Sequence, residues 1–224
     1  MRRSLKALAA LLAYPERPLI DALPEIEDAV RLDRDLPVPV QGSLAGLVAD
    51  LYGNDLIDSQ ERYVALFDRS RSLSLHLFEH VHGDSRERGP AMVDLLKLYN
   101  SHGVDIAEGE LPDYLPTYLE YAALLDRAAG VAALADIAHI LVPIRDRLEK
   151  RQSPYVAVFD AALAMSGAAV LPAASDDADA VDDDFAALDR AWEEAAVTFG
   201  PENEPGKSGD CGRAQDILRR MNAS

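Results

Sequence analysis

The stretch Leu134–Leu148, LADIAHILVPIRDRL, decides the fold class. Its large apolar residues recur three and four positions apart, which is the spacing of one buried face of an α-helix: Leu134, Ile137, Leu141, Ile144 and Leu148. Pro143 removes one backbone hydrogen bond inside this pattern, so we expect a bend there. The segment is therefore predicted to be a long core helix.

The composition favours helices in the rest of the chain. Apolar residues make up 49% of the 224 residues, and Leu and Ala dominate them. That balance is typical of packed helices rather than of sheets. A chain of this length holds one domain of ordinary size together with a tail. We predict an all-α protein, built as a single globular multi-helix bundle.

Turn residues and apolar spacing place the other helices. They are expected near residues 5–12, 19–34, 44–51, 55–67, 72–82, 92–103, 115–125 and 155–166. Ser43 and Asp55 are predicted N-caps, and a Thr117-x-x-Glu120 capping box is predicted near the start of the helix at 115–125. Gly83 is the predicted stop for the helix over 72–82, which is apolar on two sides.

The chain changes character near residue 173. Residues 173–224 hold 13 acidic and 5 basic side chains, a net charge of −8 out of −17 for the whole chain, and include the run Asp176–Asp184. Low hydrophobicity and repeated like charges are typical of mobile segments. We predict a helical domain over 1–172 and an acidic, largely disordered tail over 173–224, with room for a short helix at 183–197.

The charge and the cysteine content exclude several classes of function. Phosphate binding needs clustered Lys and Arg, so the acidic chain is expected to bind neither nucleic acid nor anionic membrane surfaces. No apolar run approaches the roughly 20 residues of a membrane helix, which argues against direct membrane insertion. Cys211, the only cysteine, allows no intrachain disulfide and no Cys-based metal cluster. These features predict a cytoplasmic protein.

The N-terminus imitates an export signal, because Arg2 and Arg3 precede a short apolar stretch. Lys6 interrupts that stretch and Tyr14-Pro15 ends it early. Its leucines follow helical spacing, so we interpret it as an amphipathic helix of the mature protein: Leu5, Leu8, Leu11 and Leu12.

The segment Phe67–Gly89, FDRSRSLSLHLFEHVHGDSRERG, holds three of the five histidines. Within it, His76-x-x-Glu79-His80 matches the H-x-x-E-H pattern of inverted zinc proteases, in which two histidines one helical turn apart bind zinc and the glutamate activates water. A third ligand is needed, and Glu120 or Glu149 could supply it. The pattern is short enough to arise by chance, so a zinc-dependent hydrolase is kept only as the alternative function.

Plainer interpretations exist for the same histidines. Glu79-x-x-His82 is half of a di-iron helix-bundle motif, but such a site requires a second copy. Asp136-x-x-His139 is the nearest candidate, and we interpret it as a surface acid beside a packing histidine. His76 and His80 are equally well explained as residues that form hydrogen bonds at the edge of the core.

Four arginines flank this apolar segment: Arg69, Arg71, Arg86 and Arg88. One interpretation is a set of surface salt bridges to nearby carboxylates. The other is a polar rim around a hydrophobic groove, the arrangement that binds an amphipathic helix through its apolar face.

The segment resembles a known family. Phe67-Asp68-Arg69 and Leu77–Gly89 are similar to the NarJ-type assembly chaperones of respiratory nitrate reductase, also called its delta subunit and related to the TorD-like redox-enzyme maturation chaperones. The likeness continues through AMVDLL at 91–96, ELPDYLP at 110–116 and YLEY at 118–121, and returns in AWEE at 191–194 and VTF at 197–199. Ser70 stands where glycine would be expected. The resemblance spans nearly the whole chain.

The resemblance implies a cytosolic chaperone with an all-helical fold, not an enzyme, and with no cofactor of its own. It implies binding of the apo catalytic (alpha) subunit of respiratory nitrate reductase, including the N-terminal segment of that subunit. The client would be kept competent for molybdenum-cofactor insertion before it docks at the membrane.

Carried onto this sequence, the resemblance assigns no catalytic and no metal-binding residue. It implies client binding by Phe67, Arg69, Leu77, Phe78, Glu79, His80, His82 and Arg86. If His80 or His82 borders the client groove, affinity is expected to change with pH near 6.

Overall fold

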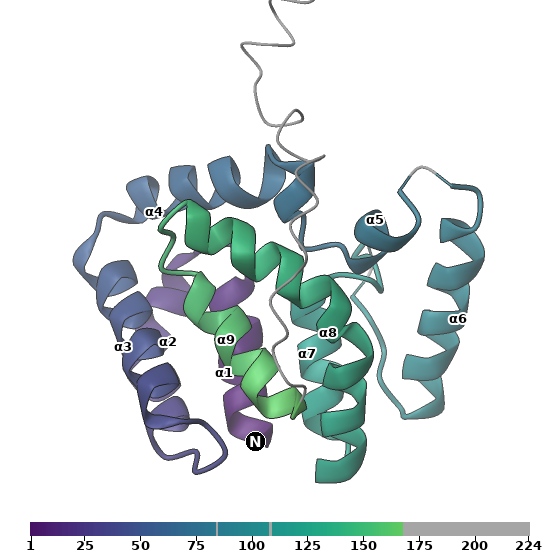
Figure 1. Cartoon of the computed structure of the whole chain (residues 1–224), viewed down its shortest axis with the longest axis horizontal. Helices are drawn as coiled ribbons and strands as arrows, with labels where there is room; N and C mark the ends of the chain where they lie inside the picture. Colours follow the sequence, from purple (N-terminus) through teal and green to yellow (C-terminus); the bar gives the residue numbers. More distant parts are fainter. Residues whose placement is uncertain (84, 108, 168–224) are drawn as a thin grey trace, which may run out of the picture. The chain divides into compact units, whose positions relative to one another are not determined.

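The computed structural model describes residues 1–83, 85–107 and 109–167, and over these ranges it confirms the all-α prediction (Figure 1). The α-helices are α1 (Arg2–Leu12), α2 (Arg17–Arg31), α3 (Val38–Gly53), α4 (Leu56–Tyr63), α5 (Leu77–Val81), α6 (Arg88–Ser101), α7 (Leu115–Leu124), α8 (Arg127–Lys150) and α9 (Val156–Ser166). A π turn, Val64–Asp68, continues α4, and a 3-10 turn, Arg71–Leu73, follows. The predicted tail from residue 173, its short helix and Cys211 lie outside the described residues.

Helix α1 packs against α2, α7 and α9 and confirms the predicted amphipathic first helix. Its leucines are at most 1% exposed: Leu5, Leu8, Leu11 and Leu12. Burying a side chain of this size contributes about 1.5–3 kcal/mol relative to leaving it in water. The N-terminal segment is therefore part of the core of the bundle.

Helix α8 contains the stretch that decided the fold class. Its apolar stripe is buried, with Leu134, Leu141, Ile144 and Leu148 at 0% exposure. The helix begins where the Asp126 carboxylate accepts a hydrogen bond from Ala129 N at 2.9 Å, and it continues through Pro143. It has the length and hydropathy of a membrane span, but its apolar side packs against α7 and α9, as in the core helix of a globular protein (Figure 1).

Two predicted N-caps are wrong for one reason: a residue type that favours capping was assigned where the helix had already begun. Helix α3 begins at Val38, directly after Pro37, so Ser43 lies inside it. Proline is tolerated in the first turn because no N–H is needed there. Thr117 likewise lies within the first turn of α7, where its hydroxyl donates to Glu110. The predicted Asp55 cap is confirmed, since its carboxylate accepts from Ile57 N at 2.8 Å.

The predicted continuous helix over 72–82 is also wrong. After the 3-10 turn the backbone is extended through His76, and only Leu77–Val81 is helical. His76 pairs with Tyr114 in an isolated antiparallel bridge, in which Leu77 N donates to Asp113 O at 2.9 Å and Leu115 N donates to Leu75 O at 2.8 Å. The residues before α7 therefore satisfy backbone groups that a helix would have used. Gly83, with φ of +52°, ends α5 as expected.

Candidate functional site

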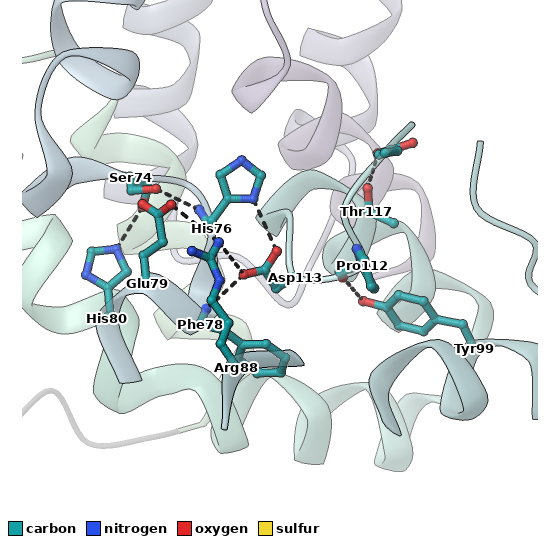
Figure 2. A network of polar contacts seen from close by, with 11 residues as sticks. Ser74, His76, Phe78, Glu79, His80, Arg88, Tyr99, Pro112, Asp113 and Thr117 are labelled. Carbon is teal, nitrogen blue, oxygen red and sulfur yellow. Dashed lines mark hydrogen bonds and ion pairs between the residues drawn. The ribbon is translucent and has the colours of Figure 1, made fainter. Parts of the chain in front are cut away.

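The centre of the site is Asp113, a fully buried carboxylate just before α7 (Figure 2). One oxygen accepts from His76 Nδ1 at 3.2 Å, and the other accepts from Phe78 N at 3.1 Å. The Arg88 guanidinium lies 3.6 Å from that second oxygen. A buried charge is tolerated only when it is paired and hydrogen-bonded, and Asp113 meets both conditions. It joins the segment before α5, α5 itself and α6.

Helix α5 carries the outer part of this network. Glu79 pairs with Arg88 at 3.3 Å, and His80 Nε2 donates to Ser74 O at 2.8 Å, as Figure 2 shows. Ser74 Oγ in turn accepts from His76 N at 3.2 Å. The polar residues of the segment that resembles the chaperone family therefore hold the segment in its unusual extended path.

His76 lies between Asp113 and an aromatic ring. The hydrogen bond to Asp113 raises the pKa of His76 above its ordinary value, against the opposing effect of partial burial. Its ring lies 5.4 Å from that of Tyr114, centroid to centroid. The imidazole is half-buried, so solvent reaches one side of it. Protonation of His76 therefore changes the charge at a partly open surface.

A cluster of aromatic residues continues from Tyr114 into the bundle. Tyr63 donates to Leu12 O at 2.8 Å, and its hydroxyl lies 3.1 Å from that of Tyr114. Burial raises the pKa of Tyr63, so the hydroxyl remains a proton donor at neutral pH. The Tyr63 ring makes an edge contact with Tyr14 at 5.6 Å and packs on Phe67 at 4.9 Å. The end of α1 and the π turn are thereby fixed against each other.

A cavity of about 250 Å³ opens beside this aromatic cluster; it is lined by Tyr14, Tyr63, Phe67, Asp68, Leu75, His76 and Tyr114. A wider hollow of about 610 Å³ shares Tyr14 with it and is lined by Ile57, Gln60, Glu61, Arg62, Val64, Ala65 and Arg69. We call these two hollows together the Tyr14 groove. Ile57 and Tyr14 are 64% and 42% exposed, so the groove presents apolar surface to solvent between charged residues.

The π turn shapes the wall of the Tyr14 groove. Arg69 N donates to Val64 O at 3.1 Å, which is the wider spacing of a π turn. Such turns occur frequently at functional sites. Here Phe67 points into the core, at 5% exposure, whereas Ala65 and Arg69 are exposed.

The geometry argues against the zinc hypothesis. His76 precedes α5 in extended backbone, so it is not one helical turn from His80 on a common face. The Nε2 of His80 is protonated, because it donates to a carbonyl oxygen, and a protonated nitrogen cannot ligate zinc. Glu149, one proposed third ligand, is ion-paired with Arg145 on α8. Over residues 1–83, 85–107 and 109–167 no three His, Cys, Asp or Glu side chains could hold a metal ion.

The predicted site residues fall into three groups. Phe67 and Arg69 line the Tyr14 groove. Leu77 is 2% exposed and belongs to the core. The remaining residues do not line the groove: Phe78, Glu79, His80 and His82 are half-buried on or next to α5, and Arg86 is exposed in the following loop. His139, interpreted as a packing residue, is exposed on α8 beside Asp136.

Sequence reasoning missed the residues that hold the site together. Asp113 and Tyr114 stand inside the ELPDYLP motif, which was the only signal that could have pointed to them. Tyr14 follows the end of α1 and Tyr63 is the last residue of α4, and neither carries a motif of its own. Their contact is visible only in three dimensions.

The comparison with known proteins fits this arrangement. The family model described as nitrate reductase delta subunit matches residues 33–161, which include the groove except for Tyr14. The chain belongs to this family. The nitrate reductase molybdenum cofactor assembly chaperone NarJ of Escherichia coli K12 is 42% identical over 201 residues, covering 86% of this chain and 83% of the relative.

Two further relatives have similar names. The probable nitrate reductase molybdenum cofactor assembly chaperone NarW of E. coli K12 is 39% identical, covering 89% of this chain and 84% of the relative. The probable chaperone of the same description, NarJ of Bacillus subtilis 168, is 33% identical over 104 residues, 46% of this chain and 56% of the relative. The predicted family is confirmed.

Proposed function

We propose that this protein is a dedicated assembly chaperone of a respiratory nitrate reductase. It binds the apo catalytic subunit, including the N-terminal segment of that subunit, and keeps it competent for molybdenum-cofactor insertion before membrane docking. The observation that carries this proposal is the 42% identity, over 86% of the chain, to a nitrate reductase molybdenum cofactor assembly chaperone. The protein acts by binding and not by catalysis, and it works in the cytoplasm without a cofactor of its own.

The Tyr14 groove is the proposed client site. It is an apolar hollow bordered by charged side chains, with Ile57 and Tyr14 exposed inside it and Arg62 and Arg69 along it. Such grooves accept the apolar face of an amphipathic helix, while rim charges set its register. Of the residues expected from the family, Phe67 and Arg69 act in the groove directly.

The predicted site residues on and near α5 have a different proposed role. Asp113 holds the extended segment that carries His76 to the groove, and the buried Leu77 anchors the end of that segment. His80 holds the same segment through Ser74 O, and Glu79 pairs with Arg88 and so joins α5 to α6. Phe78, His82 and Arg86 form a neighbouring surface that extends the contact to the client. The rings of Phe78 and His82 are in contact, with 5.5 Å between their centroids, and this contact keeps the two side chains together.

The groove can be tested by titration calorimetry against a peptide that copies the N-terminus of the cognate catalytic subunit. Ala65 is exposed on the groove wall, so Ala65→Glu places a charge in the contact without disturbing the core. We expect the dissociation constant to rise about tenfold or more, which corresponds to about 1.4 kcal/mol. Ala49→Glu, at an exposed position of α3 outside the groove, is the matched control and should bind like the unchanged protein.

Three results would contradict the proposal in different ways. If the unchanged protein did not bind the peptide, the N-terminal segment of the catalytic subunit would be excluded as the client. Equal weakening by both variants would remove the groove as the site. Zinc at one equivalent after purification without chelators, together with hydrolytic activity, would restore the hydrolase alternative.

The helical domain over 1–172 is proposed to contain the whole client site. A chain that ends at Pro172 should then bind the peptide with the affinity of the full chain. Loss of binding on truncation would assign part of the site to the acidic tail.

A further inference from the structure

Helices α1 and α2 border a hollow of about 540 Å³ that shares no residue with the Tyr14 groove. The two helices are antiparallel neighbours, since Ser4 Oγ in the first turn of α1 donates to Ala29 O near the end of α2 at 3.3 Å. We call this hollow the α1–α2 groove. Every residue that lines it precedes residue 33, where the match to the family model begins. The groove therefore lies outside both the family match and the proposed client site.

The floor of the α1–α2 groove is apolar and made mostly of small side chains: Ala7, Ala10, Ala22, Ile26 and Ala29. On each helix these residues stand three or four positions apart, so they form one face of that helix. Leu32, at 67% exposure, extends the floor at one end. From Ala22 to Leu32 the backbone rises about 15 Å, which is the length of about three helical turns. Small side chains let the axis of a docked helix approach to about 8–10 Å.

The two edges of the α1–α2 groove carry opposite charges. Arg3 and Lys6 stand on the α1 edge, and Glu25 and Asp28 stand on the α2 edge, all of them exposed. Arg3, Lys6 and Glu25 form no ion pair within the part of the chain that the structure describes. Asp28 has a surface pair with Arg31, at 2.7 Å. Exposed pairs of this kind contribute little, so all four edge charges are available to a ligand.

An apolar floor between edges of opposite charge selects one kind of ligand. A hollow accepts a convex element, and an amphipathic helix presents an apolar stripe between two polar edges. Carboxylates along one edge of such a helix pair with Arg3 and Lys6, and cations along its other edge pair with Glu25 and Asp28. A helix with charges of one sign meets repulsion at one side of the groove. A second copy of this chain is disfavoured, because two chains of net charge −17 repel each other.

We propose that the α1–α2 groove docks an amphipathic helix of a partner protein, with acidic residues along the edge that faces α1 and basic residues along the edge that faces α2. The partner helix contacts the groove over about three turns. Its apolar residues recur three and four positions apart and cover the alanines of the floor. The contact is separate from the Tyr14 groove, so it forms whether or not the client segment is bound.

Designed peptides and the full chain test this charge pattern. Each peptide is a helix of about 14 residues, about 21 Å long, with leucines along one face and a covalent staple on the opposite face. The bipolar peptide has Glu along one edge of the leucine face and Lys along the other edge. Two comparison peptides have Glu along both edges or Lys along both edges.

The bipolar peptide should shift the ¹⁵N amide signals of Ala7, Ala10 and Ala29. At about 150 mM salt, where the screening length is about 8 Å, it should bind about fivefold or more tightly than either comparison peptide. Equal binding of the three peptides would overturn the proposal. Binding of the bipolar peptide that leaves the signals of α1 and α2 unchanged, or no binding of it, would also overturn the proposal.

Reversing one edge of the groove should change which peptide binds best. Arg3→Glu with Lys6→Glu makes both edges acidic and changes only exposed positions. This variant should bind the bipolar peptide about fivefold or more weakly and should prefer the peptide with Lys along both edges. Arg34→Glu with Lys150→Glu, exposed outside the groove, changes the net charge equally and should keep the preference for the bipolar peptide. The same change of preference in both variants would reveal an effect of net charge and overturn the proposal.

Two measurements distinguish other occupants of the groove. Saturation with the peptide that copies the N-terminus of the catalytic subunit should leave the affinity for the bipolar peptide unchanged. Displacement of one peptide by the other would assign the α1–α2 groove to the client and overturn the proposal. In sedimentation of the protein alone, a dimer that Arg3→Glu with Lys6→Glu abolishes would assign the groove to a second copy and overturn it as well. The designed peptides do not depend on the client, so this proposal can hold even where the proposed function fails.

Discussion

His76 Nδ1 lies 3.2 Å from Asp113 Oδ1, although the two residues are 37 positions apart. The pair connects the extended segment before α5 with the segment that leads into α7. The backbone follows the same connection, since His76 and Tyr114 form an antiparallel bridge. The position of His76 beside the Tyr14 groove therefore depends on a carboxylate that is 0% exposed.

Replacing Asp113 should destabilise the protein. Asp113→Ala leaves His76 Nδ1 and Phe78 N without their acceptor and removes one of the two carboxylates paired with Arg88. We expect a loss of about 2–4 kcal/mol in the free energy of unfolding. Asp113→Asn should cost less, because the amide oxygen can still accept from Phe78 N. Urea denaturation measures both. Asp105→Asn, exposed in the same connection, should have almost no effect, and an equal loss there would contradict the role of Asp113.

The same pair predicts a pH dependence of stability. The pKa of His76 is raised in the folded state by the bond to Asp113, so the folded protein binds the proton more tightly than the unfolded chain does. This contribution is complete below the unfolded pKa of about 6.5 and is lost as the pH rises through the raised pKa. Urea denaturation between pH 6 and pH 8 should show it.

His76→Gln is the matched variant for this test. It should lose more stability at pH 6 than at pH 8, because only the protonated imidazole forms the ion pair. His139→Gln, exposed on α8, should show no such difference. A His76 effect that is the same at both pH values would mean that the histidine is held by packing alone.

The long helices could be predicted from the sequence because each buries one face. Leu134, Ile137 and Leu141 repeat at helical spacing since that face packs into the core. The segment 72–82 could not be predicted in the same way. Leu73, Leu75 and Leu77 are all at most 3% exposed, and a segment buried on several sides carries no helical period. Its path is set by Asp113, about 40 residues away.

The candidate site was predictable only where a motif existed. Phe67 and Arg69 belong to the segment that resembles the family, and both line the groove. Tyr14, Tyr63 and Tyr114 were missed because each is an ordinary aromatic residue in its own segment. Their positions become meaningful only when α1, α4 and the segment before α7 pack together, and the spacing of residues along the chain does not contain that information.

The N-terminal amine predicts an acid-sensitive contact. The Met1 ammonium lies 2.5 Å from Asp33 Oδ2, and Ser4 also donates to this carboxylate. Burial alone would raise the pKa of Asp33, but these partners lower it overall. The pair therefore stabilises the protein above the unfolded pKa of about 3.9 and is lost as the pH falls through the lowered pKa.

Asp33→Asn should destabilise the protein by about 1–3 kcal/mol at pH 7. Acetylating the α-amine should have a similar effect, because it removes the partner charge. In a double-mutant cycle followed by thermal unfolding, the two changes together should cost clearly less than their sum. Strict additivity would show that the amine and the carboxylate act independently.

Tyr63→Phe tests the aromatic cluster beneath the groove. Tyr63 is 4% exposed, and its hydroxyl donates to Leu12 O at 2.8 Å and contacts the Tyr114 hydroxyl. Removing the hydroxyl leaves a buried carbonyl oxygen without its principal donor, so we expect a loss of about 1–3 kcal/mol in urea denaturation. Tyr52→Phe, at 70% exposure, should change stability by less than about 0.5 kcal/mol.

Tyr114→Phe separates the two bonds of Tyr63. This variant keeps the bond between Tyr63 and Leu12, because the Tyr114 hydroxyl lies 3.5 Å from Leu12 O and contributes little to it. It should therefore cost less than Tyr63→Phe, and the double variant should cost less than the sum, because the two hydroxyls share one contact. A larger loss for Tyr114→Phe would mean that Tyr114, and not Tyr63, fixes the end of α1 against the groove.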